Sequence, residues 1–273
     1  MEEKLFIDKC FNDYNLKLRL RGYSNSTNYL YLNNFKKFAN NFKLRIDNLT
    51  YNEICEYVLN ECKDKSHSFQ NGLINTIKFY FEKVRYRKRK YYKIDRPKQF
   101  SKLPQVIDHK EIMQSINNIN NIKHKSIISL AYSCGLRVSE VCNLKIKDMD
   151  SKRMIIKINC SKGKKDRIVP LSQNMLFLLR KYYKQFKPKT YLFESCKEDK
   201  KYSTRSCQEI WKKYKINQQS TFHTLRHSCF TYLLENGVDI RIIKDIAGHN
   251  NIKTTEGYTH ISKKILNQVK LPI

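Results

Sequence analysis

Six side chains in the second half of the chain could act together on a phosphate ester: Arg137, Lys162, His223, Arg226, His249 and Tyr258. An arginine stays ionised at any working pH and presents a planar fork of N–H donors to phosphate oxygens. A neutral histidine can accept a proton, and a lysine ammonium can give one. A phenol has a pKa of about 10, so a tyrosine attacks phosphorus only where a cationic pocket stabilises the phenolate. The set therefore suits charge stabilisation and proton transfer at a phosphodiester.

Each of these residues has an ordinary alternative interpretation when it is taken alone. Arg137 stands at the start of a predicted helix, directly after a turn that Gly135 allows, where surface arginines are common. Lys162 lies in a tight turn, where a lysine usually serves solubility, and Tyr258 is one of 18 tyrosines. Only the ordered combination of residues is specific.

The two histidines stand at opposite ends of predicted helices. His223 and Arg226 are three residues apart at a helix start and therefore share one face. The positive end of the helix dipole opposes further positive charge, so we expect His223 to stay neutral and able to accept a proton. A capping or packing histidine is the alternative. His249 follows Gly248 at the end of another helix, and Tyr258 comes nine residues later.

The charge of the chain points to a polyanionic partner. Its 273 residues include 54 Lys and Arg against 25 Asp and Glu, which gives a net charge of +29. Clustered cations gain affinity for nucleic acid by releasing the counterions condensed on its phosphates. An anionic membrane surface is the alternative partner. The 40% hydrophobic content can fill a core, which argues against a disordered chain.

Other classes of protein are disfavoured. No run of about 18 apolar residues is present, and the first residues are acidic where a signal peptide is basic, so we expect a cytoplasmic protein. The nine cysteines include no C-x-x-C pair, so we expect reduced thiols rather than a disulfide framework or a zinc site. Neither paired carboxylates nor a Gly-rich phosphate loop stands out, so we expect no metal and no nucleotide cofactor.

The elements that must position the six residues are mostly helices. The sequence predicts a mainly α protein with a small antiparallel β-sheet, an α+β fold. Helices are predicted at 28–42 and at 69–84. Between them, Thr50 and Glu53 form a capping box that predicts the start of another helix. They form a helical domain that we place at residues 1–90, and we assign no element before Asn28.

A basic run leads into a linker at residues 91–104. Such a run is usually a solvated connection, and in a chain this basic the alternative is an arm that tracks a phosphate backbone. The residues that we expect to contact DNA are Arg85, Arg87, Lys88, Arg89, Lys90 and Lys93.

The second domain, at residues 105–273, begins with a capping box formed by Asp108 and Glu111. β-branched runs at 154–159 and 167–169 flank the turn that holds Lys162, and 191–193 is predicted as a third strand. Helices are predicted at 109–117, 124–133, 137–144, 172–186, 205–214, 223–236, 239–247 and 255–266.

The six residues resemble, in order and spacing, the catalytic set of the tyrosine recombinase or phage integrase family. The resemblance covers essentially the whole chain, namely a helical core-binding domain, a basic linker and a catalytic domain with a hairpin lysine, and it is closest to Xer-type short integrases. Lys162, Lys164 and Lys165 compete for the lysine position, and family spacing favours Lys162 because it directly precedes Gly163. One departure is Ile246-Ala247-Gly248-His249, where the family often has Leu-Leu-Gly-His.

The resemblance implies a site-specific DNA recombinase. Tyr258 would be the nucleophile that forms a 3′-phosphotyrosine link, and Lys162 would protonate the leaving 5′ oxygen. His223 would help to deprotonate the nucleophile, while the two arginines and His249 hold the phosphate. Glu140 lies one helical turn from Arg137 and could orient it by a salt bridge, an exposed helix pair being the alternative.

The resemblance also implies partners. These are double-stranded DNA, three further copies of the chain in a homo-tetramer on two duplexes, and an accessory DNA-bending protein as an optional factor. Residues 261–273 would dock on a neighbouring copy or pack on their own domain. Two other functions stay open: nicking and closing as in type IB topoisomerases, which share this chemistry, and DNA binding without catalysis.

Overall fold

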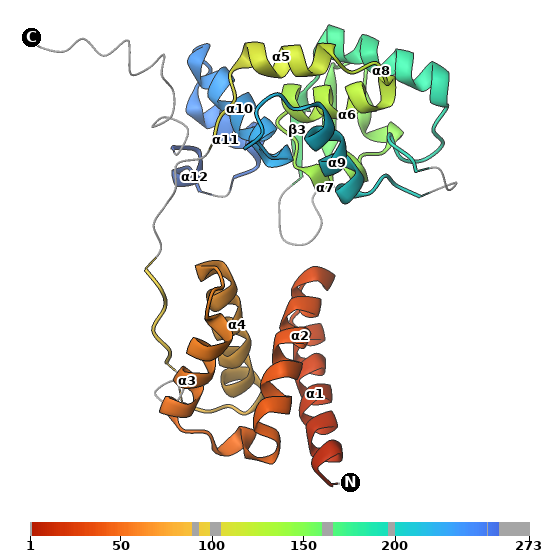
Figure 1. Cartoon of the computed structure of the whole chain (residues 1–273). Coiled ribbons are helices and arrows are strands. Elements are labelled where there is room, and N and C mark those ends of the chain that lie inside the picture. Colours follow the sequence, from red (N-terminus) through yellow and green to blue (C-terminus); the bar gives the residue numbers. More distant parts are fainter. Residues whose placement is uncertain are drawn as a thin grey trace, which may run out of the picture. The chain divides into compact units, whose positions relative to one another are not determined.

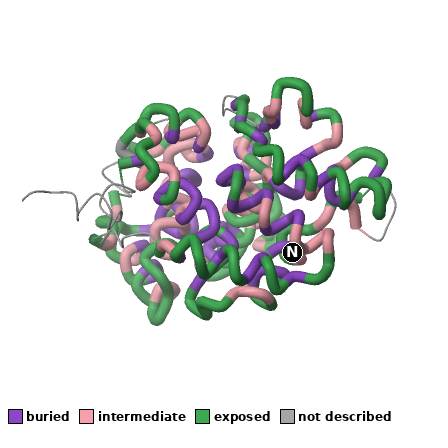
Figure 2. Tube along the Cα trace, turned by 90° about the horizontal axis from the view of Figure 1, so that it is seen from above, coloured by how far each residue is buried: buried purple, intermediate pink, exposed green. Residues whose placement is uncertain are grey.

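The structure is a computed structural model that describes residues 2–88, 93–98, 105–159, 166–195, 200–249 and 251–256. The chain folds into two compact units, residues 1–101 and 102–273 (Figure 1). In Figure 2 the buried stretches of the chain lie mostly toward the interior and the exposed stretches toward the outside. In the part of the chain that the structure describes, every helix is too short or too polar to cross a membrane.

The first unit is helical throughout its described elements. They are α1 (Glu2–Leu20), α2 (Asn25–Phe42), the 3-10 turn η1 (Lys43–Asn48), α3 (Tyr51–Cys62), α4 (His67–Phe79) and the π-helical turn η2 (Tyr80–Val84). Leaving the residues before Asn28 without an element was wrong, because α1 fills most of them. Its apolar residues lie on two sides, with Tyr14 and Leu18 buried but Leu5 and Leu16 exposed, so no single stripe reveals the helix.

Aromatic side chains fill the core of this unit. The ring of Tyr14 stacks on Phe35 with 4.1 Å between centroids, and its hydroxyl donates to the carbonyl of Thr76 at 3.1 Å. The predicted capping box at the start of α3 is confirmed. The backbone N–H of Thr50 donates to Glu53 Oε2 at 2.9 Å, and Glu53 N–H donates to Thr50 Oγ1 at 3.3 Å.

The second unit combines helices with a small sheet. Its elements are α5 (His109–Asn117), α6 (Ile122–Ser133), α7 (Val138–Asn143), the 3-10 turn η4 (Ile146–Asp148), β1 (Met149–Asp150), β2 (Ile155–Ile158), β3 (Arg167–Pro170), α8 (Gln173–Phe186), α9 (Thr204–Tyr214), α10 (Phe222–Glu235), α11 (Ile240–Ala247) and α12 (Lys253–Glu256). The predicted last helix at 255–266 overlaps α12, and the rest of it lies outside the described residues.

The sheet has the order β1-β2-β3, with antiparallel neighbours. Ile156 of β2 is opposite Met149 on one side and Val169 on the other. The predicted strand at 191–193 was wrong, because Tyr191 makes only an isolated bridge and β1 supplies the third strand. Leu192 and Phe193 are apolar because they are buried in the core, and β1 is too short to show an alternating pattern.

Helix α6 lies at the centre of the second unit and packs against α5, α7, α8, α9 and α10. Its Ile127, Ile128, Leu130 and Ala131 are completely buried. It begins two residues earlier than predicted because Asn121 caps it, accepting from the N–H groups of Lys123 and His124. The predicted fold class, mainly α with a small antiparallel sheet, is confirmed.

Candidate active site

The structure brings four of the six predicted residues to one region of the second unit. Arg137 precedes α7, His223 and Arg226 lie on α10, and His249 follows α11. The other two, Lys162 and Tyr258, lie outside the described residues. Helices that are distant in sequence therefore place two arginines and two histidines around a common centre.

The carboxylate of Glu140 forms that centre. Its Oε1 accepts from Arg137 Nη1 at 2.8 Å, and its Oε2 accepts from the backbone N–H of Arg137 at 2.8 Å. The two terminal nitrogens of Arg167 donate to the same two oxygens, each at 2.8 Å. Arg226 Nη1 lies 3.9 Å from Oε2. The side chain of Glu140 is only 11% exposed, so the alternative of an exposed helix pair does not hold.

The surroundings of Glu140 keep it ionised. Burial alone would raise the pKa of this carboxyl group, but the hydrogen bonds and charge of Arg167, together with the donors of Arg137, lower it to about 2. Glu140 is thus an anion at neutral pH, and it fixes the guanidinium groups that surround it.

Arg226 is held from two sides. Its side chain is 1% exposed, its Nη1 donates to the carbonyl of Gly135, and its Nη2 donates to the carbonyl of Ala247, both at 2.5 Å. Gly135 has a φ of 59°, and a Cβ at this position would lie 2.6 Å from the ring of Phe230. A glycine is therefore required where the chain turns to present its carbonyl to Arg226.

The histidines of the site are neutral at pH 7. Burial, followed by the charges of Arg226 and Arg137, lowers the pKa of His223, which agrees with the expectation that this histidine stays uncharged. Burial and the nearby arginines lower the pKa of His249 to about 4. Arg226 has only donors and its Nη2 lies 3.3 Å from His249 Nε2, so Nε2 accepts. The Nδ1–H of His249 then donates to Thr255 Oγ1 at 2.9 Å.

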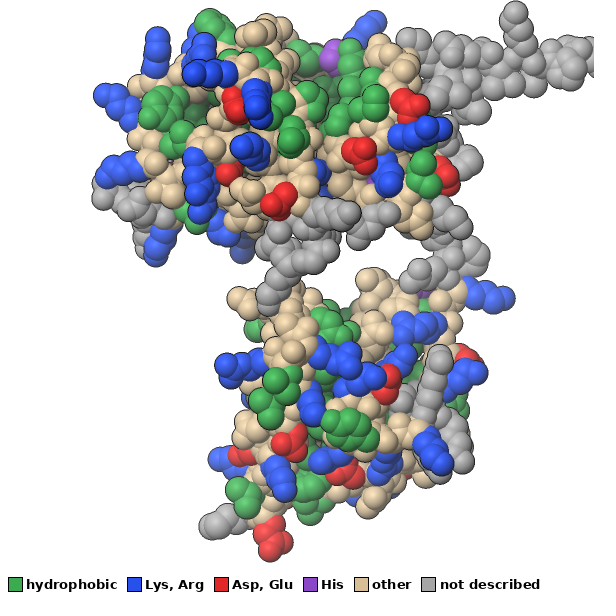
Figure 3. Space-filling view, turned by 180° about the vertical axis from the view of Figure 1, so that it is seen from behind, with side chains coloured by type: hydrophobic (Ala, Val, Ile, Leu, Met, Phe, Trp, Pro, Cys, Tyr) green, Lys and Arg blue, Asp and Glu red, His purple; other side chains and the backbone are tan. Residues whose placement is uncertain are grey.

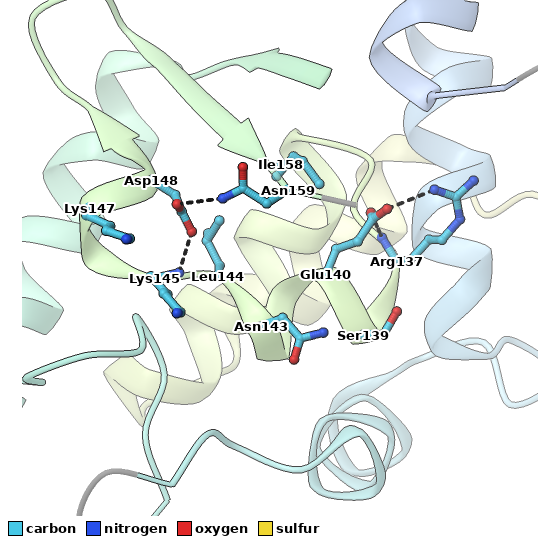
Figure 4. A pocket seen from close by; sticks show the side chains of 10 residues that line it. All are labelled: Arg137, Ser139, Glu140, Asn143, Leu144, Lys145, Lys147, Asp148, Ile158 and Asn159. Carbon is cyan, nitrogen blue, oxygen red and sulfur yellow. Dashed lines mark hydrogen bonds and ion pairs between the residues drawn. The ribbon is translucent and has the colours of Figure 1, made fainter. Parts of the chain in front are cut away.

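Two hollows flank the cluster. A cavity of about 310 Å³ opens beside Arg137, and Figure 4 shows Arg137 and Glu140 on one side of it and Lys145, Asp148 and Asn159 on the other. A second cavity of about 580 Å³ is lined by Arg167, Gly248 and His249, among others. The side chain of Arg137 is 24% exposed and is thus open to a ligand.

Residues 105–264 match the model of the phage integrase family. The chain belongs to this family. It is 38% identical to the tyrosine recombinase XerA of Pyrococcus horikoshii over 182 residues, which are 64% of each chain. It is 31% identical to XerA of Pyrococcus furiosus over 98% of this chain and 95% of that one. The family prediction made from the sequence is confirmed.

The match with the Pyrococcus horikoshii protein spans less than two thirds of that protein's length. Among solved structures, a lambda integrase tetramer bound to a Holliday junction matches 92% of this chain and 76% of that one, with a TM-score of 0.75 and 15% identity. At that identity the likeness concerns the fold alone.

Sequence reasoning overlooked one residue of the cluster at Glu140, Arg167, which was assigned only to a strand. The signal was present in the alternation of β3, where Arg167 and Val169 are buried while Ile168 between them is 56% exposed. An arginine on the core face of a strand needs a buried partner, because an unpaired buried charge is costly.

The basic residues expected to contact DNA differ in their surroundings. Arg85 is tied into the first unit, since its Nε donates to Asp47 Oδ1 at 2.8 Å and to the hydroxyl of Tyr80 at 2.9 Å. Lys88 and Lys93 are exposed and Arg87 is partly buried. Residues 89 and 90 lie outside the described residues.

Across the described ranges, three or more His, Cys, Asp or Glu side chains nowhere come together as a metal site. The absence of a metal from the reaction stays a prediction. His227 has its ring 4.5 Å from that of His223, and burial lowers its pKa to about 4.

Proposed function

We propose that this chain is a site-specific DNA recombinase that breaks and rejoins duplex DNA through a 3′-phosphotyrosine intermediate. The cluster at Glu140 carries the proposal. Three guanidinium groups lie 2.8–3.9 Å from this one carboxylate, so the four side chains carry two more positive than negative charges. The neighbouring histidines are neutral. A partly buried surplus of this kind is complementary to an anion such as a phosphodiester.

In the proposed reaction each residue has one task. Arg137 and Arg226 hold the non-bridging oxygens and stabilise the charge that grows on them in the transition state. His223, neutral at pH 7, accepts the proton of the Tyr258 hydroxyl. The phenolate oxygen attacks phosphorus, the bond to the 5′ oxygen breaks, and Lys162 gives that oxygen a proton. The reverse attack by a second 5′ hydroxyl rejoins DNA without a nucleotide cofactor.

The proposal extends to the first unit and to the assembly. We propose that the first unit binds duplex DNA with its basic surface. Figure 3 shows Lys and Arg side chains spread over the visible faces of both units, with fewer Asp and Glu among them. The fold likeness to lambda integrase supports a homo-tetramer on two duplexes as the active form.

Plasmid exchange tests this function and separates it from nicking and closing. Two plasmids that carry the DNA flanking the protein's own gene are incubated with the protein, and recombinant circles are scored. We expect recombinants with the wild-type chain and none with Tyr258→Phe, while Tyr183→Phe, an exposed tyrosine on α8, behaves as wild type. Relaxation of supercoils without exchange would instead indicate a topoisomerase.

A further inference from the structure

Three hydrogen bonds from Arg167 to other described residues connect separate parts of the site. Its side chain is 5% exposed, and its two terminal nitrogens donate to both oxygens of Glu140. The third bond runs from Nε to the carbonyl of Ile246 at 2.7 Å. One guanidinium group on β3 therefore joins the start of α7 to the end of α11.

The first connection reaches Arg137. A carboxylate on a Glu side chain turns easily about its last torsion, and a two-pronged guanidinium contact fixes its plane. Because each oxygen of Glu140 that accepts from Arg167 also accepts from Arg137, the contact with Arg167 sets the direction in which Arg137 is held.

The second connection reaches His249. Ile246 lies in the last turn of α11, two residues before Gly248, which has a φ of 61° and turns the chain toward His249. A Cβ on Gly248 would lie 2.8 Å from Cδ of Arg167, so the two residues pack directly against each other. Loss of the Arg167 side chain would release both the carbonyl of Ile246 and this packing.

We propose that Arg167 is a positioning residue for strand cleavage, which sets Arg137 through Glu140 and sets His249 through the end of α11. Three donors of Arg167 point to Glu140 and Ile246, and these contacts carry its effect on Arg137 and His249. This inference rests on the proposed function. A charged residue is not needed here for stability alone, since apolar residues of similar volume often replace buried ion pairs at no cost.

The test separates cleavage from binding with the full-length chain. Single-turnover cleavage of a nicked duplex, taken from the DNA flanking the gene, is measured beside DNA affinity in a gel-shift assay. We expect Arg167→Gln to slow cleavage about 100-fold, the effect of misplacing catalytic groups by about 1 Å, with DNA affinity unchanged. Arg167→Lys keeps the positive charge but loses the two-pronged guanidinium contact, so we expect its cleavage rate to lie between those of the wild type and of Arg167→Gln.

Two further variants complete the design. Arg180→Gln removes the same charge from an exposed position on α8 and is expected to cleave at the wild-type rate. Because Arg167 acts partly through Glu140, the double variant of Arg167→Gln with Glu140→Gln is expected to lose less cleavage than the two single losses combined. If Arg167→Gln does not fold, Arg167→Lys replaces it in the single and double variants.

The outcomes are distinct. Wild-type cleavage by Arg167→Gln overturns the inference and leaves the proposed function intact. Arg167→Gln could instead lose cleavage, DNA affinity and resistance to urea unfolding together, with additive effects on cleavage in the double variant. That result would make Arg167 a purely structural residue and would also overturn the inference. Absence of cleavage by the wild-type chain contradicts the proposed function itself.

Discussion

At the scale of the residue, the site widens the pH range over which its buried ionisable groups keep the charge states that they have at neutral pH. Glu140 stays an anion because guanidinium donors surround it, and His249 stays neutral because burial and the same cations oppose its protonation. The arrangement leaves positive charge where a phosphodiester would develop negative charge.

These charge states predict how stability depends on pH. The pKa values of His227 and His249 are about 4 in the folded chain, below the value of about 6.5 in an unfolded chain. Between these values the unfolded chain binds more protons, so stability falls as the pH falls from 6.5 toward 4. Thermal melting across this window should show the decline, and His227→Gln should flatten it. An equal slope in both proteins contradicts this assignment.

Gly135 gives a second prediction at this scale. We expect Gly135→Ala to cost about 3 kcal/mol of unfolding free energy, because it adds left-handed strain to a clash with Phe230. Gly237→Ala is the matched control: φ is 81° there, but a Cβ meets open space, so only the strain of about 1 kcal/mol remains. Urea unfolding measures both, and equal losses contradict the role of Phe230.

The sequence revealed the chemical groups better than their connections. Arg137, His223, Arg226 and His249 were found because their types and local spacing are informative. The contact between Glu140 and Arg167 joins residues 27 positions apart, and it depends on the tertiary placement of β3, which pairs with β2 and packs against α11. Helical spacing could suggest only the local pair of Glu140 with Arg137.

At the scale of the element, helix starts could be predicted from the sequence. Short strands, and helices whose apolar residues lie on more than one face, could not. Thr50 and Asp108 cap helices as expected, since capping is a local property. Asp108 accepts from the N–H of Lys110, one residue earlier than a capping box requires. Helix α1 and strand β1 depend on tertiary packing, and local patterns did not reveal them.

The basic segment after η2 gives a prediction at this scale. Arg85→Ala should lower the stability of the first unit by about 2 kcal/mol, because it breaks a charged hydrogen bond to Asp47. Lys88→Ala, at an exposed position, should leave stability unchanged and reduce the salt slope of DNA binding by about 1. Urea unfolding measures the stability of each variant, and DNA binding at several salt concentrations measures the salt slope. A stable Arg85→Ala with a reduced salt slope, or a destabilised Lys88→Ala, would contradict these assignments.

At the scale of the whole molecule, the net charge of +29 governs encounter with a polyanion. Two domains were expected from the helical pattern, the basic run and the capping box at Asp108, and the structure has two compact units, residues 1–101 and 102–273.

The charge predicts a strong salt dependence. Affinity of the full-length chain for duplex DNA should fall about 10³- to 10⁵-fold between 50 and 200 mM salt, as for about six to ten phosphate contacts. Anionic phosphatidylserine vesicles, assayed by co-sedimentation, test the membrane alternative. Binding to vesicles that exceeds binding to DNA at the same salt concentration contradicts the assignment of DNA as the partner.

The most direct test of the central claim is to trap the covalent intermediate. A duplex taken from the DNA flanking the gene, nicked just beyond the cleavage position so that the short fragment is lost, is incubated with protein in excess EDTA. The proposed function predicts a protein–DNA adduct on a denaturing gel, and peptide mass spectrometry should map its phosphate to Tyr258. Tyr258→Phe should give no adduct. An adduct that requires Mg²⁺, or that persists in Tyr258→Phe, contradicts it.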